Sequence, residues 1–232
     1  MRIAEIFASL QGEGLLAGTP STFIRTSGCN LRCVWCDTPY TSWRPEGRDL
    51  TADEVRTEID ALTPHHVVMT GGEPLLVEEA IDLCRLLRQA GRHVTVETAG
   101  TVLPTGSEPW CDLVSISPKL GSSTPPADTP GGWGPRHEQG RRRDDVVRAL
   151  ATAAPYQIKF VVESAADLAE AEAWLADLGD GIDRRRVFLM PQARLPDELA
   201  GRTAWLAGEC RRLGLRLAPR HHITWFGGRR GT

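Results

Sequence analysis

The sequence predicts an α/β fold with a parallel sheet, arranged as a partial (incomplete) TIM-like (β/α)6 barrel. Short segments rich in apolar and β-branched residues alternate with longer helical stretches along most of the chain, and this alternation is typical of parallel βαβ units. About six such units can be recognised, fewer than the eight of a complete barrel. The chain has 232 residues, enough for one substantial hydrophobic core, so we expect residues 1–232 to form a single domain.

Each predicted element follows from its local pattern. Strands are predicted at residues 22–26, 66–70, 93–98, 113–117, 156–162, 186–190 and 215–218. Helices are predicted near residues 52–62, 77–90, 144–153, 165–178 and 197–213. Thr51-x-x-Glu54 and Ser164-x-x-Asp167 have capping-box spacing at the start of two of these helices. Gly91 stands where a C-terminal cap would end the helix at 77–90.

The segment 121–140 interrupts the alternation. It contains Ser-Ser-Thr-Pro-Pro and Thr-Pro-Gly-Gly-Trp-Gly-Pro, and little else that could pack into a core. We therefore predict a long loop here, and loops of this length in compact domains are usually functional or are tolerated insertions. A tolerated loop insertion is the favoured interpretation, and a lid is the alternative.

Composition and charge restrict the classes of partner. The net charge of −3 gives no reason to expect direct nucleic-acid binding. No apolar run approaches the ~18–20 residues of a membrane span, and Glu5 stands where a signal peptide would have its hydrophobic region. These features, with cysteines expected to be reduced, predict a cytoplasmic protein without a membrane partner.

The most informative motif is Cys29-x3-Cys33-x2-Cys36. Three thiolates on one short loop can bind three irons of a cubane iron–sulfur cluster, whereas a cluster that only transfers electrons normally takes four cysteines. The motif therefore predicts a cluster with one iron open to a substrate or cofactor.

Two other interpretations of these cysteines are weaker. A structural zinc site usually takes four Cys or His ligands, and the nearest histidines in the sequence are His65 and His66. A disulfide scaffold is typical of small, cysteine-rich secreted domains, which this chain does not resemble. Cys84, Cys111 and Cys210 are scattered singly, and Cys84 lies in an apolar helical stretch typical of a core residue.

Polar and glycine-rich residues follow the predicted strands. The cysteine loop follows the strand at 22–26, and residues 70–74 (Thr-Gly-Gly-Glu-Pro) and 97–101 (Glu-Thr-Ala-Gly-Thr) follow the next two. Residues 117–119, Lys159 and residues 190–192 are assigned to later strand ends. Ligands of parallel α/β folds bind beyond the carboxyl ends of the strands, so the sequence predicts a site along this rim.

The cysteine motif and the segment Gly71-Gly-Glu-Pro74 together resemble the radical S-adenosylmethionine (SAM) enzymes. The resemblance implies that Cys29, Cys33 and Cys36 hold a [4Fe-4S] cluster, whose open iron is chelated by SAM. It also implies that the chemistry is carried by the cluster and SAM, with no catalytic side chain. Glycines allow a backbone to approach a ligand closely, which suits a segment that holds the SAM amino group.

A second set of segments is similar to the 7-carboxy-7-deazaguanine synthase family and covers nearly the whole chain. The segments are residues 7–14, 23–29, 36–38, 117–119, 159–162, 190–192 and 220–225. This resemblance implies radical-mediated ring contraction of 6-carboxy-5,6,7,8-tetrahydropterin to 7-carboxy-7-deazaguanine, with loss of ammonia. The product serves queuosine and related 7-deazapurine biosynthesis, and thus a tRNA modification pathway.

The family resemblance also implies roles for individual residues. The implied substrate contacts are Leu10, Gln11, Gly12, Arg25 and Thr70. The implied SAM contacts are Trp35, Cys36, Asp37, Gly72, Ser117, Pro118, Lys119, Met190, Pro191, Gln192 and Ala193, and Thr38 is the implied Mg²⁺ ligand. An Arg fork suits a substrate carboxylate, and a hydroxyl is a hard ligand suited to Mg²⁺.

Other residues in these motifs have two open interpretations. Glu13 and Glu73 are as compatible with capping backbone amides or pairing with an Arg as with substrate contact. His221 and His222 fit packing or surface roles better than ligation.

Two alternative functions remain open at this point. One is a glycyl-radical-enzyme activase, a small radical SAM protein with the same cysteine spacing, against which residues 11–14 and 117–119 argue. The other is a zinc-binding interaction module. For the favoured function, the family implies an electron donor such as flavodoxin or ferredoxin, and a homodimer.

Overall fold

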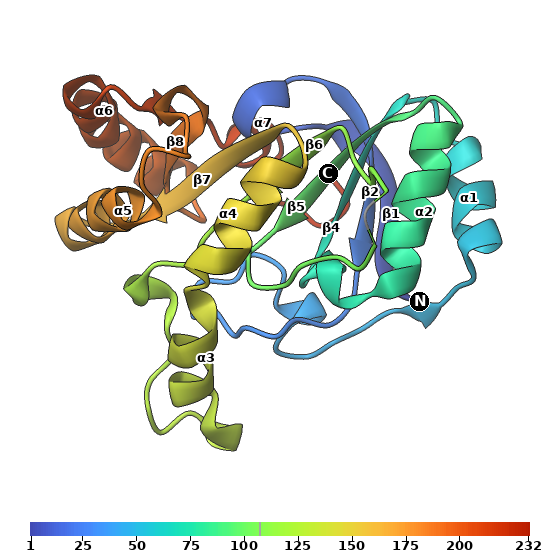
Figure 1. The fold of residues 1–232 in the computed structure, drawn as a ribbon, viewed down its shortest axis with the longest axis horizontal. Helices are drawn as coiled ribbons and strands as arrows, with labels where there is room; N and C mark the ends of the chain where they lie inside the picture. Colours follow the sequence, from blue (N-terminus) through green and yellow to red (C-terminus); the bar gives the residue numbers. More distant parts are fainter. Residues whose placement is uncertain (107) are drawn as a thin grey trace.

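The computed structural model describes residues 1–106 and 108–232, and its strands form one open sheet. The strand order is β3-β1-β2-β4-β5-β6-β7-β8-β9 (Figure 1). The strands are β1 (Arg2–Leu10), β2 (Pro20–Thr26), β3 (Arg48–Asp49), β4 (His66–Gly71), β5 (His93–Thr98), β6 (Leu113–Ile116), β7 (Tyr156–Val162), β8 (Val187–Pro191) and β9 (Arg216–Leu217). From β2 to β9 along this order, neighbouring strands are parallel.

The sheet does not close into a barrel, because the order begins at β3 and ends at β9. The six longer parallel strands, β2 and β4 to β8, confirm the predicted partial barrel. At one edge, β1 runs antiparallel to both β2 and β3. Because Leu10 at the end of β1 pairs with Pro20 at the start of β2, the residues after β1 lie beside the amino end of β2.

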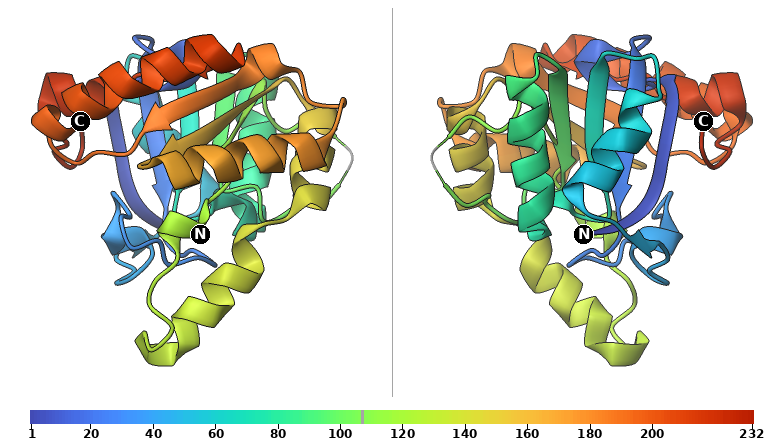
Figure 2. Two further views of the ribbon diagram at one scale, coloured as in Figure 1. Left: turned by 90° about the vertical axis from the view of Figure 1, so that its left-hand side faces the viewer. Right: turned by 90° about the vertical axis from the view of Figure 1, so that its right-hand side faces the viewer.

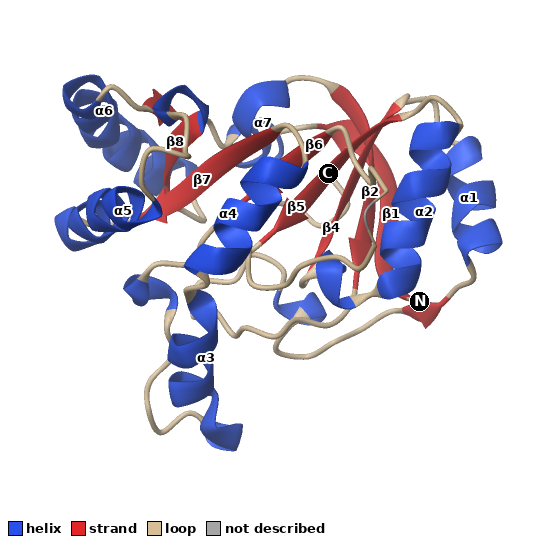
Figure 3. Cartoon of the chain, in the orientation of Figure 1, coloured by secondary structure: helices blue, strands red, loops and turns tan. Residues whose placement is uncertain are grey.

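The helices are α1 (Ala52–Asp60), α2 (Glu78–Gln89), α3 (Trp133–Arg141), α4 (Asp144–Ala153), α5 (Ala165–Leu178), α6 (Pro196–Leu213) and α7 (His221–Phe226). Helices α1, α2, α4 and α5 lie over one face of the sheet (Figure 3). The main core is formed between this layer and the sheet by residues such as Ile81, Val94 and Phe160. All seven residues of β7 are buried, and this strand lies inside the sheet between β6 and β8.

Several local predictions are confirmed. Strands β5 and β7 and helices α4 and α5 have the predicted bounds. Thr51 and Ser164 each form a capping box, with Glu54 and Asp167 respectively. Gly91 follows α2 with a φ of +84°, the left-handed conformation that glycine adopts after a helix.

Four elements were absent from the sequence-based expectation. They are β1, β3, α7 and α3, of which α3 replaces part of the loop predicted over residues 121–140. That segment also contains 3-10 turns at Gly121–Ser123 and Pro130–Gly132. Figure 2 shows α3 projecting from the rest of the molecule. Within the described residues, no helix combines the length and apolar character needed to cross a bilayer.

Candidate functional site

A cavity of about 550 Å³ opens at the carboxyl ends of the parallel strands. This volume lies in the range of small-molecule sites, ~300–1,000 Å³. Its wall includes the ends of β1, β2, β4 and β5, the cysteine loop, and the segment from Gly228 to Thr232. Residues from both ends of the sequence therefore share one site.

The three motif cysteines line this cavity on one side. The Sγ atom of Cys36 lies 3.3 Å from Ser42 Oγ, and the Sγ of Cys29 accepts a hydrogen bond from the backbone N–H of Leu31 at 3.4 Å. Burial raises the pKa of the Cys29 thiol to about 11 and that of Cys33 to about 12. Because a thiolate is the metal-binding form, binding of a metal or cluster here displaces protons from these thiols.

The turn after β4 packs tightly against the start of the cysteine loop. Gly72 donates its backbone N–H to the carbonyl of Thr26 at 3.1 Å, and Glu73 donates to the carbonyl of Gly28 at 2.9 Å. A Cβ on Gly72 would collide with the Gly28 carbonyl oxygen. Only glycine permits this approach, which fixes the cysteine loop beside the end of β4.

Glu73 has a structural role in this turn. Its carboxylate accepts hydrogen bonds from the backbone N–H groups of Leu75 and Ala99, at 3.1 and 2.8 Å, and from the Thr98 hydroxyl at 3.0 Å. Its side chain is fully buried, and burial raises its pKa. The capping interpretation of Glu73 is therefore confirmed.

Charged side chains in the same cavity form a buried network around Lys159. The Lys159 Nζ lies 2.8 Å from Glu13 Oε2 and 3.8 Å from Glu97 Oε1, and its side chain is only 3% exposed. Burial alone would raise the pKa of Glu13, but the charges of Lys159 and Arg220 hold it well below its ordinary value. Burial would likewise lower the pKa of Lys159, yet Glu13 and Glu97 raise it. Both groups are therefore charged near neutral pH.

A glycine turn places Glu13 in this network. Gly14 has a φ of +70°, and a Cβ on it would lie 2.5 Å from Gln157 Oε1. That amide oxygen accepts a hydrogen bond from the backbone N–H of Leu15 at 2.8 Å. The turn is thus held directly over β7, the strand that carries Lys159.

Arg220 links this network to the cysteine loop. Its Nε lies 3.4 Å from Glu13 Oε1, and its guanidinium also pairs with the carboxylate of Asp37, the residue after Cys36. Its Nη1 donates to the carbonyl of Ala193 at 2.6 Å. His222 lies beside the same group, with Nδ1 3.8 Å from Glu13 Oε1. One side chain therefore fastens three segments distant in the sequence.

A second set of polar side chains surrounds Glu97. It includes Gln11 and Thr70, two of the predicted substrate contacts. The Glu97 carboxylate accepts hydrogen bonds from Gln11 Nε2 at 3.2 Å and from the Thr70 hydroxyl at 2.9 Å. Gln11 Oε1 in turn accepts the backbone N–H of Glu13 at 3.1 Å. These groups present both donors and acceptors to the cavity.

Arg25 occupies the neighbouring wall in contact with Glu5. Its Nε donates to Glu5 Oε2 at 2.9 Å, and the Tyr40 hydroxyl donates to the same oxygen at 2.7 Å. Arg230, near the end of the chain, binds Glu5 Oε1 at 2.7 Å and lies over the Tyr40 ring at 3.9 Å from its centroid. The charge of Glu5 is thus shared between two arginines.

The cavity collects most of the predicted site residues. Sixteen line it: Leu10, Gln11, Gly12, Arg25, Cys29, Cys33, Trp35, Cys36, Asp37, Thr38, Thr70, Gly72, Ser117, Lys119, Met190 and Ala193. Pro118, Pro191 and Gln192 do not; the Gln192 side chain accepts a hydrogen bond from Arg202 of α6 at 2.5 Å. Lys159 lies in the middle of β7, so its assignment to a strand end is wrong.

Several polar residues in the cavity were not among the predicted contacts. They are Glu13, Tyr40, Glu97, Lys159, Arg220, His222 and Arg230. The sequence left the role of Glu13 open and favoured a packing or surface role for His222, and the structure places both beside Arg220 in the network. No local pattern could link Arg220 to Glu13, which lies 207 residues earlier.

Thr38, the predicted Mg²⁺ ligand, lies in the cavity among other oxygen and sulfur atoms. Its hydroxyl lies 3.2 Å from the Thr41 hydroxyl and 3.9 Å from Cys36 Sγ. Across residues 1–106 and 108–232, no three His, Cys, Asp or Glu side chains are gathered closely enough to hold a single metal ion.

Comparison with known proteins places the chain in a superfamily. The family model described as "Radical SAM superfamily" matches residues 23–166, more than half of the sequence. This chain is therefore a radical SAM enzyme, a class that uses SAM and a [4Fe-4S] cluster.

The residues present fit these two groups. Three thiols supply the ligand set of a cluster with an open iron. The Trp35 Nε1 atom, on the same cavity wall, is buried and has no hydrogen-bond partner among the described residues. A bound cofactor can accept this orphan hydrogen bond, since a buried unpaired donor is unfavourable.

Proteins of similar sequence identify the family within this superfamily. The 7-carboxy-7-deazaguanine synthase of Rhodopirellula baltica is 45% identical over 99% of this chain and 88% of that protein. The enzyme of the same name from Halobacterium salinarum is 44% identical over 95% of this chain and 88% of that protein.

Solved structures agree. The crystal structure of QueE from Escherichia coli matches with a TM-score of 0.68 and 27% identity, over 94% of this chain and 92% of that one. Streptococcus suis SuiB bound to S-adenosylmethionine is similar in fold alone, with a TM-score of 0.51 and 12% identity over 82% of this chain and 47% of that chain. The chain therefore belongs to the radical SAM superfamily and, within it, to the 7-carboxy-7-deazaguanine synthase family.

Proposed function

We propose that this chain is a 7-carboxy-7-deazaguanine synthase that converts 6-carboxy-5,6,7,8-tetrahydropterin to 7-carboxy-7-deazaguanine and ammonia, as a carbon–nitrogen lyase. The observation that carries the proposal is a single cavity lined both by the three thiols and by the Glu13–Lys159–Glu97 network. Such a cavity can hold a cluster, a cofactor and a polar substrate together. The names of the relatives give the reaction its identity.

The cofactors would bind on the thiol side. Cys29, Cys33 and Cys36 would hold the cluster. Trp35, Gly72, Ser117, Lys119, Met190 and Ala193 would surround SAM, and they line the cavity beside the cysteines. Pro118, Pro191 and Gln192 do not line the cavity, so they would only support the residues that do. When bound, the cluster and SAM supply a carbon radical able to remove a hydrogen atom from the substrate.

The protein's part is to bind and orient the substrate. The donors and acceptors of Gln11, Thr70 and Glu97 suit the heteroatoms of a pterin ring. The Arg25 guanidinium suits the substrate carboxylate, which would take over part of its present contact with Glu5. Leu10 and Gly12 would shape the same side of the cavity. Holding the reacting carbon in one position can contribute strongly to the rate.

Mg²⁺ is proposed at the Thr38 hydroxyl. Mg²⁺ prefers oxygen ligands and keeps several waters, so a single protein hydroxyl suffices when the substrate supplies other oxygens. The neighbouring Thr41 hydroxyl, 3.2 Å away, can orient the Thr38 oxygen. Coordinated Mg²⁺ would stabilise negative charge on substrate oxygens.

The remaining assignments belong to the same proposal. The enzyme would take electrons from a flavodoxin or ferredoxin, act as a homodimer without membrane or nucleic-acid partners, and work in the cytosol, where thiols stay reduced. Its product would enter queuosine or related 7-deazapurine biosynthesis, and so tRNA modification.

An anaerobic assay tests the proposed reaction. The reconstituted protein is incubated with 6-carboxytetrahydropterin, SAM, Mg²⁺ and dithionite, and 7-carboxy-7-deazaguanine is detected by mass spectrometry. We expect a brown protein with about four irons per chain and formation of product. Cys33→Ala is expected to lose both. A full-length, iron-loaded wild type that consumes no pterin would contradict the proposal.

A further inference from the structure

We propose that Arg230, near the end of the chain, is a specificity-determining residue for carboxylated substrates and acts through Glu5 and Arg25. When a substrate carboxylate binds Arg25, Arg230 keeps the charge of Glu5 paired, so the two carboxylates do not compete for one guanidinium. The inference rests on the proposed function in one respect, namely that Arg25 binds the substrate carboxylate. In this role Arg230 is a positioning residue, because its effect reaches the substrate through two other side chains.

Glu5 lies beside Arg25 on the neighbouring strand. The two residues are direct partners in the antiparallel pair of β1 and β2, and the Arg25 Nε lies 2.9 Å from Glu5 Oε2. Arg25 lines the cavity, whereas the Glu5 side chain is only 10% exposed. The guanidinium that a substrate carboxylate must reach is therefore already paired. Two like charges at one cation repel each other, so Glu5 alone would oppose binding of an anionic substrate group.

Arg230 supplies a second cation for Glu5. Its Nε lies 2.7 Å from Glu5 Oε1, whereas Arg25 binds the other oxygen, Oε2. Because the arginines use different oxygens, the contact with Arg230 can remain when Arg25 turns toward a substrate. The Tyr40 hydroxyl also donates to Oε2, at 2.7 Å, and burial raises the pKa of Tyr40 to about 12, so this donor keeps its proton. Glu5 thus avoids being left as an unpaired buried charge, which would be strongly unfavourable.

Other contacts hold Arg230 in this position. Its Nη1 lies 2.9 Å from Glu46 Oε2, and its guanidinium lies over the Tyr40 ring, 3.9 Å from the centroid. These contacts join the end of the chain to the segment that follows the cysteine motif. Residues 228–232 all line the cavity, so the attachment of Arg230 also fixes part of the cavity wall.

The coupling between the substrate and Arg230 must be reciprocal. If the contact of Arg230 with Glu5 favours binding of a substrate carboxylate, that carboxylate strengthens the attachment of Arg230 by the same factor. A neutral group at the same place would leave Glu5 on Arg25 and would gain nothing from Arg230. The arrangement therefore favours an anionic substituent over a neutral substituent of similar size.

Direct contact between Arg230 and the substrate is the competing explanation, since Arg230 also lines the cavity. The two explanations differ in the effect of Glu5. If Arg230 acts through Glu5, removing the charge of Glu5 also removes the need for Arg230. If Arg230 binds the substrate directly, its loss persists whatever stands at position 5. A double-mutant cycle between the two residues separates these cases.

Ligand binding without turnover tests the proposal. Pterin-6-carboxylate and the neutral 6-hydroxymethylpterin are titrated by calorimetry into the reconstituted enzyme, with SAM present and no reductant. We expect Arg230→Met to weaken binding of the carboxylate at least about fivefold and to leave binding of the neutral ligand unchanged. Arg230→Lys, which keeps the charge, should recover most of the affinity. The double variant Glu5→Gln/Arg230→Met should bind the carboxylate within about twofold of wild type.

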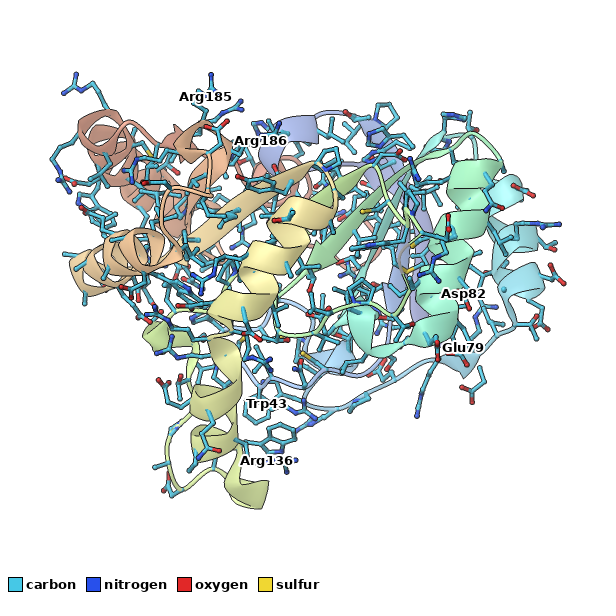
Figure 4. All side chains as sticks on the ribbon, in the orientation of Figure 1. Trp43, Glu79, Asp82, Arg136, Arg185 and Arg186 are labelled. Carbon is cyan, nitrogen blue, oxygen red and sulfur yellow. The ribbon has the colours of Figure 1, made fainter. Side chains whose placement is uncertain are left out.

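Arg186→Met is a matched control. The Arg186 side chain is 44% exposed, compared with 48% for Arg230, and it too pairs with a carboxylate, that of Asp183. Arg186 also lies over a tyrosine ring, 5.2 Å from the centroid of Tyr156. It directly precedes β8, where it is labelled beside Arg185 in Figure 4, and it lies outside the cavity lining. This variant should bind both ligands as the wild type does.

Proteolysis of the wild type gives a second measurement. Trypsin cleavage after Arg229 should be slowed more by pterin-6-carboxylate than by 6-hydroxymethylpterin, because only the carboxylate strengthens the contact between Arg230 and Glu5. Equal protection by both ligands would overturn the coupling.

The binding results distinguish this inference from the proposed function. An equal loss of both ligands in Arg230→Met, the same loss in Arg186→Met, or no recovery in the double variant would overturn the role of Arg230 alone. A wild type that binds the carboxylate no better than the neutral ligand would refute the assigned role of Arg25, and this inference with it. A wild type that shows the expected binding pattern but makes no product with a reductant would refute the proposed reaction and leave the role of Arg230 standing.

Discussion

Replacement of Lys159 by methionine gives the sharpest test of the charge network in the cavity. Methionine keeps much of the volume of the lysine stem but removes the cation that lies between Glu13 and Glu97. The Lys159 side chain is 3% exposed, so water cannot easily replace the lost partner. The two carboxylates are then left close together in a buried site, which is unfavourable.

The magnitude of the effect follows from the contacts that remain. Removing one partner of a buried ion pair costs about 3–5 kcal/mol. Arg220 stays 3.4 Å from Glu13, and Gln11 and Thr70 still donate to Glu97, so we expect the lower value, about 3 kcal/mol. For a chain of 232 residues, an unfolding entropy of ~2.1 cal/mol/K per residue converts this loss to a fall in Tm of about 6 °C.

Thermal unfolding of the cluster-free protein at pH 7.5 measures the effect without involving catalysis. At this pH, the charged forms of both Lys159 and Glu13 stabilise the folded state. The raised pKa of Lys159 stabilises the fold below the unfolded value of ~10.4, and the lowered pKa of Glu13 stabilises it above ~4.3. Arg48→Met, which removes an exposed ion pair with Glu58, should cost less than ~1 kcal/mol. A Tm for Lys159→Met within about 1 °C of wild type would refute the reasoning.

Three further predictions concern single side chains. Arg25→Ala should raise the KM for the carboxylated pterin about 10- to 100-fold, because a hydrogen bond to a charged group contributes ~1.5–3 kcal/mol; an unchanged KM in steady-state kinetics would make Arg25 structural. Thr38→Ala should weaken the Mg²⁺ dependence of turnover, and an unaltered Mg²⁺ titration would remove that assignment. Burial lowers the pKa of His137 to about 4, so its neutral form stabilises the fold above pH ~6.5 and this contribution, up to about 3 kcal/mol, is lost as the pH falls toward 4. His137→Gln should therefore differ from wild type less at pH 5 than at pH 7.5 in thermal unfolding, and a constant difference would contradict this account.

The elements that could be predicted are those whose local pattern agrees with their surroundings. Strand β7 is mostly apolar and β-branched in sequence, and all of its residues are buried in the structure. Helix α5 begins with a capping box that is visible in the sequence. The strand β1 was missed because it lies near the sheet edge and only Ile3 of its nine residues is buried. Helix α3 was missed because its sequence contains two glycines and a proline and has no apolar face. The helix is held by tertiary contacts: His137 accepts a hydrogen bond from the backbone of Arg32, and Gly134 packs closely against Pro126.

The candidate site was predictable where the residues form motifs in the sequence. Cys29, Cys33 and Cys36 stand out by spacing, and the family resemblance supplied most of the remaining wall. The ionic partners of Glu13 could not be predicted, because Lys159 and Arg220 reach it from 146 and 207 residues away. A charged residue in isolation gives no indication of its partner.

The contacts of Arg220 also have a consequence for biosynthesis. Arg220 fastens both Asp37, 183 residues earlier, and Glu13. During translation, N-terminal segments emerge first, at ~5–20 residues per second. The cysteine loop is therefore synthesised long before the residue that completes its support. The support that Arg220 gives to this loop can therefore form only after the chain has been synthesised past residue 220.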